Sequence, residues 1–196
     1  LAALEDGESV TQRSLAVRIG VALGLTNSLL KRAVRKGLVK VGEAPAKRFA
    51  YYITPKGFRE KGRLVAEYLT TSLTFFRRAR EEYVDLFQQI RDRGHRRVAL
   101  VGAGELAEIA LLSAQEVGVE LYCAIQSGSN KSTFSGMRVF SRTELALSEN
   151  IEAVVIASME SPQGEYNHLC EHFDHGRIYT VPLLHIARKS NGSGAR

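Results

Sequence analysis

Apolar residues at helical spacing predict two short helices near the N-terminus. The first follows two N-cap candidates, Ser9 and Thr11, and ends at Gly20, because glycine leaves a helix with a positive φ at little cost. The second covers residues 22–36 and ends at Gly37. Two short helices joined by a turn are typical of a helix-turn-helix. The apolar positions are Leu15, Ala16, Ile19, Leu23, Leu29, Leu30, Ala33 and Val34.

A β-hairpin is predicted directly after the second helix. Residues 38–41 favour a strand, and residues 42–47 have the Gly, Pro and Ala content of a turn. Phe49, Tyr51 and Ile53 then alternate with other residues, as in a second strand. A hairpin in this position would be the wing of a winged helix-turn-helix.

One long helix is predicted over residues 56–93, with Thr54 as its cap and Pro55 in its first position. Its apolar stripe alternates spacings of four and three residues, as in a coiled coil. The helix either pairs with a second copy or packs on its own domains. We expect a homodimer through residues 56–94, because operators with two half-sites call for a twofold protein. The stripe contains Val65, Leu69, Ser72, Phe76, Ala79, Tyr83, Leu86 and Ile90.

The second half of the chain alternates predicted strands and helices, which indicates a parallel, doubly wound α/β sheet. Its length matches about one mononucleotide-binding half of such a fold. The expected strands cover residues 97–101, 120–125, 152–157 and 177–181, and the expected helices cover residues 105–117 and 163–173.

Charge separates the two halves. Residues 1–97 contain 20 Lys and Arg against 10 Asp and Glu, whereas residues 98–196 contain 7 against 11. A basic first half beside a mildly acidic second half indicates a polyanionic partner for the first half, and the alternative is an accidental asymmetry of a solvated surface.

Composition excludes several classes of protein. With 44% hydrophobic and 24% charged residues, the chain resembles an ordinary globular protein, and no apolar run is long enough for a transmembrane helix. The first residue is Leu1 rather than Met, which leaves room for an upstream segment, and no leader is visible. Cys123 and Cys170 fit no metal or redox spacing. We therefore expect a cytoplasmic protein without a membrane partner.

Polar residues of the helix-turn-helix and of the hairpin tip are candidates for contacts with double-stranded DNA. The N-terminal part of the second helix of such motifs meets base edges, where Asn pairs with adenine and Lys or Arg pairs with guanine or phosphate. The alternative is an amphipathic helix with a solvated basic face. The candidates are Gln12, Arg13, Thr26, Asn27, Ser28, Lys31, Arg32, Arg35, Lys47 and Arg48.

These segments resemble the winged-helix domain of MarR-type regulators, and most closely the branch associated with exopolysaccharide gene clusters. The resemblance covers about the first 75 residues and implies DNA binding, with polysaccharide genes as candidate targets. Such domains carry a full helix before residue 9, where this chain has only residues 1–6. The matching segments are TQRSLA at 11–16, LG at 23–24, KGLVK at 36–40 and YITPKG at 52–57.

A glycine-rich turn follows the strand predicted at 97–101. Residues 102–107 fit the pattern G-x-G-x-x-A between a strand and a helix, where backbone and helix N-terminus can approach a phosphate. Two features argue against a standard NAD site. Glu105 is a carboxylate close to the expected pyrophosphate, and the strand at 120–125 ends in Gln126 instead of an acidic residue. The polar residues 127–131 either hold a phosphate or form an exposed loop.

Residues 96–182 resemble two groups of proteins: the Rossmann domain of NADH-sensing Rex-type repressors and the N-terminal domain of sugar O- and N-acyltransferases. The shared segments are GMRVF at 136–140, Glu144-Leu145 and IEAVVIA at 151–157. The resemblance implies NAD(H), a nucleotide or a nucleotide-sugar as the effector, none of them certain. The candidate ligand-binding residues are Gly102, Ala103, Gly104, Glu105, Leu106, Gln126, Ser127 and Ser158.

The remaining chemistry-bearing residues predict neither a metal site nor catalysis. His168, Cys170, His172 and His175 lie close in sequence, but spacing fixes no third ligand, and Asp174 is a weak candidate. No nucleophile motif or catalytic triad stands out, so we expect no enzyme.

The sequence therefore predicts an α/β transcription regulator whose second domain senses a small-molecule effector. The alternatives are a nucleotide- or NAD(H)-responsive redox repressor, a small Rossmann enzyme and a protein-interaction adaptor. The expected segments are a winged helix-turn-helix at 1–55, a dimerisation or linker helix at 56–94, a Rossmann-like domain at 95–188 and a flexible tail at 189–196.

Overall fold

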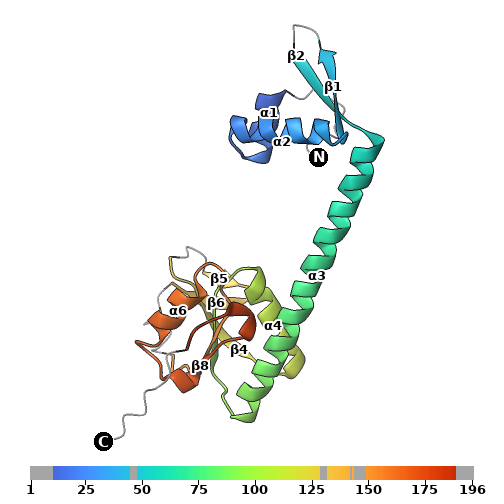
Figure 1. Cartoon of the computed structure of the whole chain (residues 1–196). Helices are drawn as coiled ribbons and strands as arrows, with labels where there is room; N and C mark the ends of the chain where they lie inside the picture. Colours follow the sequence, from blue (N-terminus) through green and yellow to red (C-terminus); the bar gives the residue numbers. More distant parts are fainter. Residues whose placement is uncertain (1–10, 45–47, 129–131, 142, 144–148, 189–196) are drawn as a thin grey trace, which may run out of the picture. The chain divides into compact units, whose positions relative to one another are not determined.

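The computed structural model describes residues 11–44, 48–128, 132–141, 143 and 149–188. The chain divides into two compact units, Leu1–Ser72 and Leu73–Arg196, and helix α3 (Pro55–Asp92) contributes to both. Figure 1 shows the elements of each unit and helix α3, which belongs to both. Ser9, the tail expected at 189–196 and the Glu144-Leu145 segment lie outside the described residues.

Helix α1 (Gln12–Ile19) begins and ends where the sequence predicts. The Oγ1 atom of Thr11 accepts a hydrogen bond from the backbone N–H of Ser14, whose own Oγ accepts one from the N–H of Thr11. This capping box satisfies two backbone donors that the helix itself leaves open. The helix ends at Gly20, which has a φ of 66°.

The rest of the first unit is a second helix, α2 (Leu23–Arg35), followed by the antiparallel strands β1 (Val39–Ala44) and β2 (Arg48–Ile53). The strands form a hairpin, drawn in light blue in Figure 1. The hairpin packs on the helices through a small core that excludes water and holds the elements together. Its buried members are Leu15, Leu30, Val39 and Tyr51.

Thr54 connects the hairpin to α3. Its hydroxyl donates a hydrogen bond to the carbonyl oxygen of Gly37 over 2.7 Å and accepts one from the N–H of Gly57 over 3.0 Å. Pro55 occupies the first helical position, where its missing N–H costs nothing. The predicted start of the long helix is therefore confirmed.

The second unit contains a six-stranded sheet in the order β5-β6-β4-β3-β7-β8, in which neighbours are parallel except for β5 and β6. The α/β class expected from the sequence is confirmed. The strands are β5 (Thr133–Phe134), β6 (Met137–Phe140), β4 (Leu121–Ile125), β3 (Val98–Val101), β7 (Ala153–Ile156) and β8 (Ile178–Tyr179).

Strands β5 and β6 were not predicted as strands. Strand β6 pairs with β4 on one side, but only Phe140 among its residues is buried, so it lacks the apolar run that marks β3 and β7. Helix α6 (Pro162–Leu169) is also shorter than predicted, since residues 170–172 form a turn.

Two hydrophobic clusters lie on opposite faces of the sheet. Val98 and Leu100 belong to the cluster that includes α3 and α4 (Glu105–Val117), whereas Ala99 and Val101 belong to the cluster that includes α6. The alternation follows from the two-residue period of a strand. Two short 3₁₀ turns, His175–Arg177 and Pro182–Leu184, flank β8.

The second half of the predicted coiled-coil stripe lies inside this unit, which corrects the expectation that the whole stripe is available for dimerisation. Ala79, Tyr83, Leu86 and Ile90 are at most 5% exposed and pack with the sheet and α4. A stripe with this spacing buries itself equally well against a second helix or against a sheet of its own chain, so the sequence pattern does not distinguish the two.

Candidate functional site

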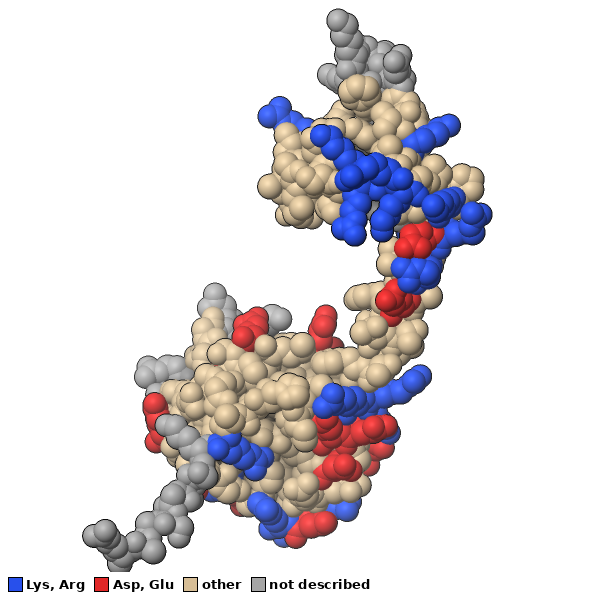
Figure 2. Space-filling model, viewed as in Figure 1, with Lys and Arg blue, Asp and Glu red and all other residues tan. Residues whose placement is uncertain are grey.

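The surplus of positive charge belongs to the first unit. Residues 1–72 contain 13 Lys and Arg against 6 Asp and Glu, whereas residues 73–196 contain 14 against 15. Figure 2 shows Lys and Arg crowded on the visible face of the first unit, and both signs mixed on the second. A polyanion is therefore attracted by the first unit alone.

One stripe of α2 carries three of the predicted DNA-contacting residues. Asn27, Lys31 and Arg35 follow one another at intervals of four residues, which places them on the same helix face. All three line an open groove of about 590 Å³ that the hairpin residues Val41 and Phe49 also line. Lys31 and Arg35 are exposed, and Asn27 is half-buried.

Gln12 helps to hold this groove together. Its Nε2 atom donates a 2.6 Å hydrogen bond to the hydroxyl of Tyr51, so that α1 is tied to β2. Tyr51 is buried, and Leu30 and Val34 line the same groove from α2. The sequence placed Gln12 among the DNA contacts, and the structure gives it a visible role in positioning the hairpin.

Thr26 does not belong to the exposed face. It is 0% exposed, and its hydroxyl donates to the carbonyl oxygen of Ala22, so it cannot meet a base edge in this conformation. The sequence pattern missed this because Thr is a common surface residue and its burial depends on packing. Ser28, Arg13 and Arg32 are exposed as expected.

The hairpin tip was also predicted to contact DNA. Lys47 lies outside the described residues, and of Arg48 only the backbone is described, at the start of β2. Sequence reasoning did not single out Val41 and Phe49, which are 43% and 58% exposed beside the basic helix. The available sequence signal was an aromatic residue on the strand pair predicted directly after a Lys- and Arg-rich helix, whereas its exposure comes from the structure.

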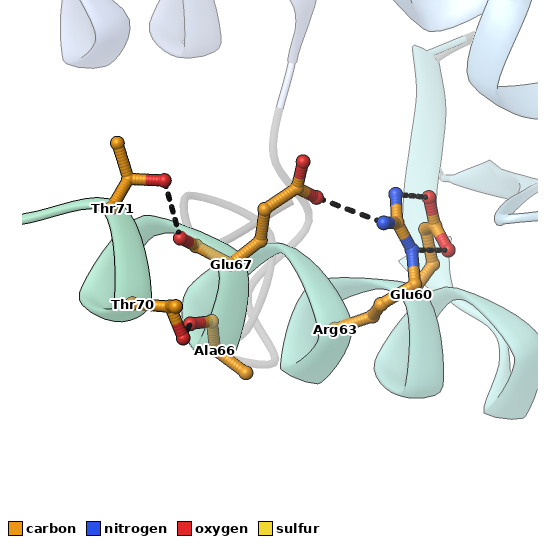
Figure 3. A network of polar contacts seen from close by, with 6 residues as sticks. All are labelled: Glu60, Arg63, Ala66, Glu67, Thr70 and Thr71. Carbon is orange, nitrogen blue, oxygen red and sulfur yellow. Dashed lines mark hydrogen bonds and ion pairs between the residues drawn. The ribbon is translucent and has the colours of Figure 1, made fainter. Parts of the chain in front are cut away.

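Within the first unit, the two sides of α3 differ in polarity. The guanidinium group of Arg63 bonds both carboxylate oxygens of Glu60 and one of Glu67, and the hydroxyls of Thr70 and Thr71 donate to carbonyl oxygens one turn back (Figure 3). Arg63 lowers the pKa of the Glu60 carboxyl through its hydrogen bond and its charge. This polar network uses the face opposite the apolar stripe.

The apolar side of α3 in the first unit is exposed. It consists of residues three, four or seven apart, so they form a continuous surface along the helix, which we call the α3 apolar face. Exposed apolar surfaces of this kind mark interaction sites. The residues and their exposed fractions are Phe58 (52%), Leu64 (46%), Val65 (47%), Tyr68 (70%) and Leu69 (52%).

In the second unit, the candidate ligand residues meet at the carboxyl edge of the sheet. The N–H of Gly102 donates to the carbonyl oxygen of Ile125, and the N–H of Ala157 donates to that of Val101, both over 2.8 Å. The ends of β3, β4 and β7 are therefore adjacent, which brings the Gly102 turn, Gln126 and Ser158 to one edge. Ligands of doubly wound sheets bind at this edge.

The two glycines of the turn differ in whether packing requires a glycine at their position. Gly102 has a φ of 117°, and a Cβ atom there would lie 2.6 Å from the carbonyl oxygen of Ala157, so packing alone requires glycine. A Cβ atom on Gly104 would meet no heavy atom within 4 Å. Leu106, a predicted ligand residue, is 2% exposed and belongs to the core.

The residues at this edge do not fit NAD(H). Gln126 follows β4 where a carboxylate would bind the ribose hydroxyls, and Glu105 places an exposed carboxylate in the first turn of α4, where a pyrophosphate would be repelled. The Glu105 carboxylate instead complements the dipole of its own helix.

Gln126 carries an unsatisfied acceptor. Among the described residues, its Oε1 atom is buried without a hydrogen-bond partner in the chain, although its backbone N–H donates to Phe140. An unpaired buried acceptor costs about 1–3 kcal/mol. A hydrogen-bond donor brought by a small molecule would remove this cost.

Comparisons with known proteins add little to these observations. No family of known sequences and no curated protein matches the chain. Among solved structures, it is similar to TrmBL2, described as an archaeal chromatin protein with a novel mode of DNA binding, at 12% identity and a TM-score of 0.24. The match covers 65% of this chain and 59% of that chain. So weak a likeness carries no argument.

In the part of the chain that the structure describes, no helix has both the length and the apolar character needed to cross a membrane.

Proposed function

We propose that the chain is a DNA-binding transcription regulator whose first unit is a winged helix-turn-helix. The observation that carries this proposal is the groove where Asn27, Lys31 and Arg35 of α2 face Val41 and Phe49 of the hairpin, in the unit that holds the charge surplus. An exposed helix with Asn, Lys and Arg at successive turns suits the major groove, where these side chains recognise adenine, guanine and phosphate.

The test is a titration of fluorescently labelled double-stranded DNA with the full chain at several salt concentrations. Because each neutralised phosphate releases counterions, the logarithm of the affinity is expected to fall linearly with the logarithm of salt concentration, by about 0.9 per phosphate contact. Lys31→Ala and Arg48→Ala should each weaken binding. No binding at about 50 mM salt, or unchanged affinity in both variants, contradicts the proposal.

A second copy of the chain is the proposed partner of the α3 apolar face. Phe58, Val65 and Leu69 follow the spacing of a helix-helix seam, and the Glu60–Arg63–Glu67 network leaves that seam free of charge. A seam on one helix is self-complementary about a twofold axis, and a twofold protein suits two operator half-sites.

The second unit is proposed to be a Rossmann-like sensor of a small molecule. The support comes from the carboxyl edge of the sheet. The space at Gly104 is open in the same turn as Gly102, and the buried Oε1 atom of Gln126 has no donor among the described residues. The ligand expected there donates a hydrogen bond to Gln126 and holds any phosphate groups away from the exposed Glu105 carboxylate, which repels anions. Nucleotide-sugars and related metabolites are the candidates, and control of polysaccharide genes is suggested by the resemblance alone.

Sensing requires the ligand to bind one geometry of the dimer more tightly than another. Native mass spectrometry of freshly purified chain, followed by identification of any molecule released on denaturation, tests the site directly. One small molecule per chain supports the sensor. If saturating concentrations of that molecule leave DNA affinity unchanged at every salt concentration, the sensing proposal is wrong, and a protein-binding adaptor becomes the favoured alternative for the second unit. We propose no catalytic role for either unit.

A further inference from the structure

A group of three potential metal ligands lies at the end of α6, outside both sites described above. His168 is in the last turn of the helix, and Glu171 and His172 follow in the turn that continues it. Residues at positions i, i+3 and i+4 share one face of a helical turn. The three ligand atoms all lie within 4.8 Å of one another.

The side chains already converge. The rings of His168 and His172 lie 5.0 Å apart between centroids, at 77° to each other, and the Nδ1 atom of His168 is 3.7 Å from a carboxylate oxygen of Glu171. His168 and Glu171 are 39% and 72% exposed, so the group is open to an ion from solvent.

The backbone beneath the group is firmly held. Leu169 is 0% and Tyr166 2% exposed, and both pack against the sheet from α6. The N–H of Glu171 donates to the carbonyl oxygen of His168, and the N–H of His172 to that of Leu169. The three side chains therefore project from a fixed turn, which lowers the entropy lost when they bind one ion.

We propose that His168, Glu171 and His172 together bind one divalent transition-metal ion. Zn²⁺ is the ion with which the proposal is tested. Two imidazole nitrogens and a carboxylate oxygen are a usual set of protein ligands for Zn²⁺, with bonds of about 2.0–2.2 Å. Such bonds place neighbouring ligand atoms about 3.4 Å apart in a tetrahedral site. The observed separations, all within 4.8 Å, therefore need to close by at most about 1.4 Å.

The neighbouring thiol and imidazole are not part of the proposed site. The Sγ atom of Cys170 lies 3.4 Å from the Nδ1 atom of His175, which also contacts the hydroxyl of Tyr166 over 3.1 Å. His175 is thus engaged with other side chains and supplies the matched control. The proposal does not depend on DNA binding or on an effector.

The experiment is isothermal titration of the tag-free, EDTA-treated full chain with Zn²⁺, for the original chain and for H168Q/H172Q, E171Q and H175Q. We expect one ion per chain, at least tenfold weaker binding in H168Q/H172Q, a smaller loss in E171Q and no change in H175Q. Zn²⁺ should raise the Tm of the original chain and of H175Q, and this rise should be lost in H168Q/H172Q.

Two results would overturn the assignment: no Zn²⁺ binding to the original chain, or equal binding by the original chain and by H168Q/H172Q. Because the substituted side chains are at least partly exposed, the variants are expected to fold. Their Tm without metal checks this and keeps a loss of binding distinct from a loss of structure.

Discussion

The hydroxyl of Tyr83 donates a 2.8 Å hydrogen bond to the carbonyl oxygen of Ile156, and both residues are completely buried. The bond joins the later turns of α3 to the end of β7. Burial raises the pKa of the Tyr83 hydroxyl far above its ordinary value, with a smaller contribution from the charge of Glu82, so the hydroxyl remains a neutral donor. These turns of α3 therefore form part of the sheet unit.

Tyr83→Phe should destabilise the second unit by about 1–3 kcal/mol, because it leaves the buried carbonyl of Ile156 without a donor. Urea unfolding monitored by circular dichroism measures this loss. Tyr68→Phe is the matched control, since Tyr68 is 70% exposed. Equal stability of the two variants would show that the buried hydrogen bond contributes nothing.

Leu69→Lys should weaken self-association at least about tenfold, or 1.4 kcal/mol, because a charge on the α3 apolar face would have to be buried between two helices. Sedimentation velocity over a concentration series reports the change. Thr70→Lys places the same charge on the neighbouring polar side, one residue away, and should leave association intact. If both variants associate as the original chain does, the dimer uses another surface.

Lys31→Ala and Arg35→Ala should each cost about 1–3 kcal/mol of DNA affinity if the residue reads a base, with loss of discrimination at one operator position. A residue that contacts phosphate should instead weaken all sequences uniformly and reduce the salt slope by about one. Fluorescence anisotropy separates the two, with a duplex selected from a random pool for tight binding to the original chain and with a scrambled version of that duplex. The control is Arg77→Ala, an exposed arginine of the second unit.

Gly102→Ala and Gly104→Ala should separate packing from ligand binding. At Gly102 the added methyl group meets the carbonyl oxygen of Ala157, so we expect a fall in Tm. At Gly104 the space is open, so Tm should change little, while affinity for a ligand in the turn should fall. Unchanged ligand affinity in Gly104→Ala would place the ligand elsewhere.

Glu152→Gln should destabilise the second unit at neutral pH and much less in acid. The carboxylate accepts hydrogen bonds from the backbone N–H groups of Arg96 and Arg97, which lower the pKa of Glu152 in the folded chain. This contribution is complete above the unfolded pKa of about 4.3 and is lost as pH falls through the lower folded pKa. Thermal unfolding from pH 7 to pH 3 should show the two curves converging. A constant difference in Tm would contradict this cause.

Several elements of the fold follow from interactions between residues that are close in the chain. Thr11 with Ser14 and Gly20 bound α1, and Thr54 with Pro55 begins α3. The apolar run at 98–101 identifies the central strand before any partner is known. Caps, turns and continuous apolar runs are recognisable in sequence because their energies depend on neighbours a few residues away.

Other features depend on contacts between distant residues, and only the tertiary structure decided them. Thr26 is buried, Phe49 is exposed beside α2, and the half-exposed β6 is recruited as a strand by β4. The stripe on α3 has one spacing throughout, yet Tyr83 is in a core and Leu69 is not. The sequence by itself determined where the helices and main strands lie, because those preferences are local. Which face each element buries was decided by the neighbours that the fold brings to it.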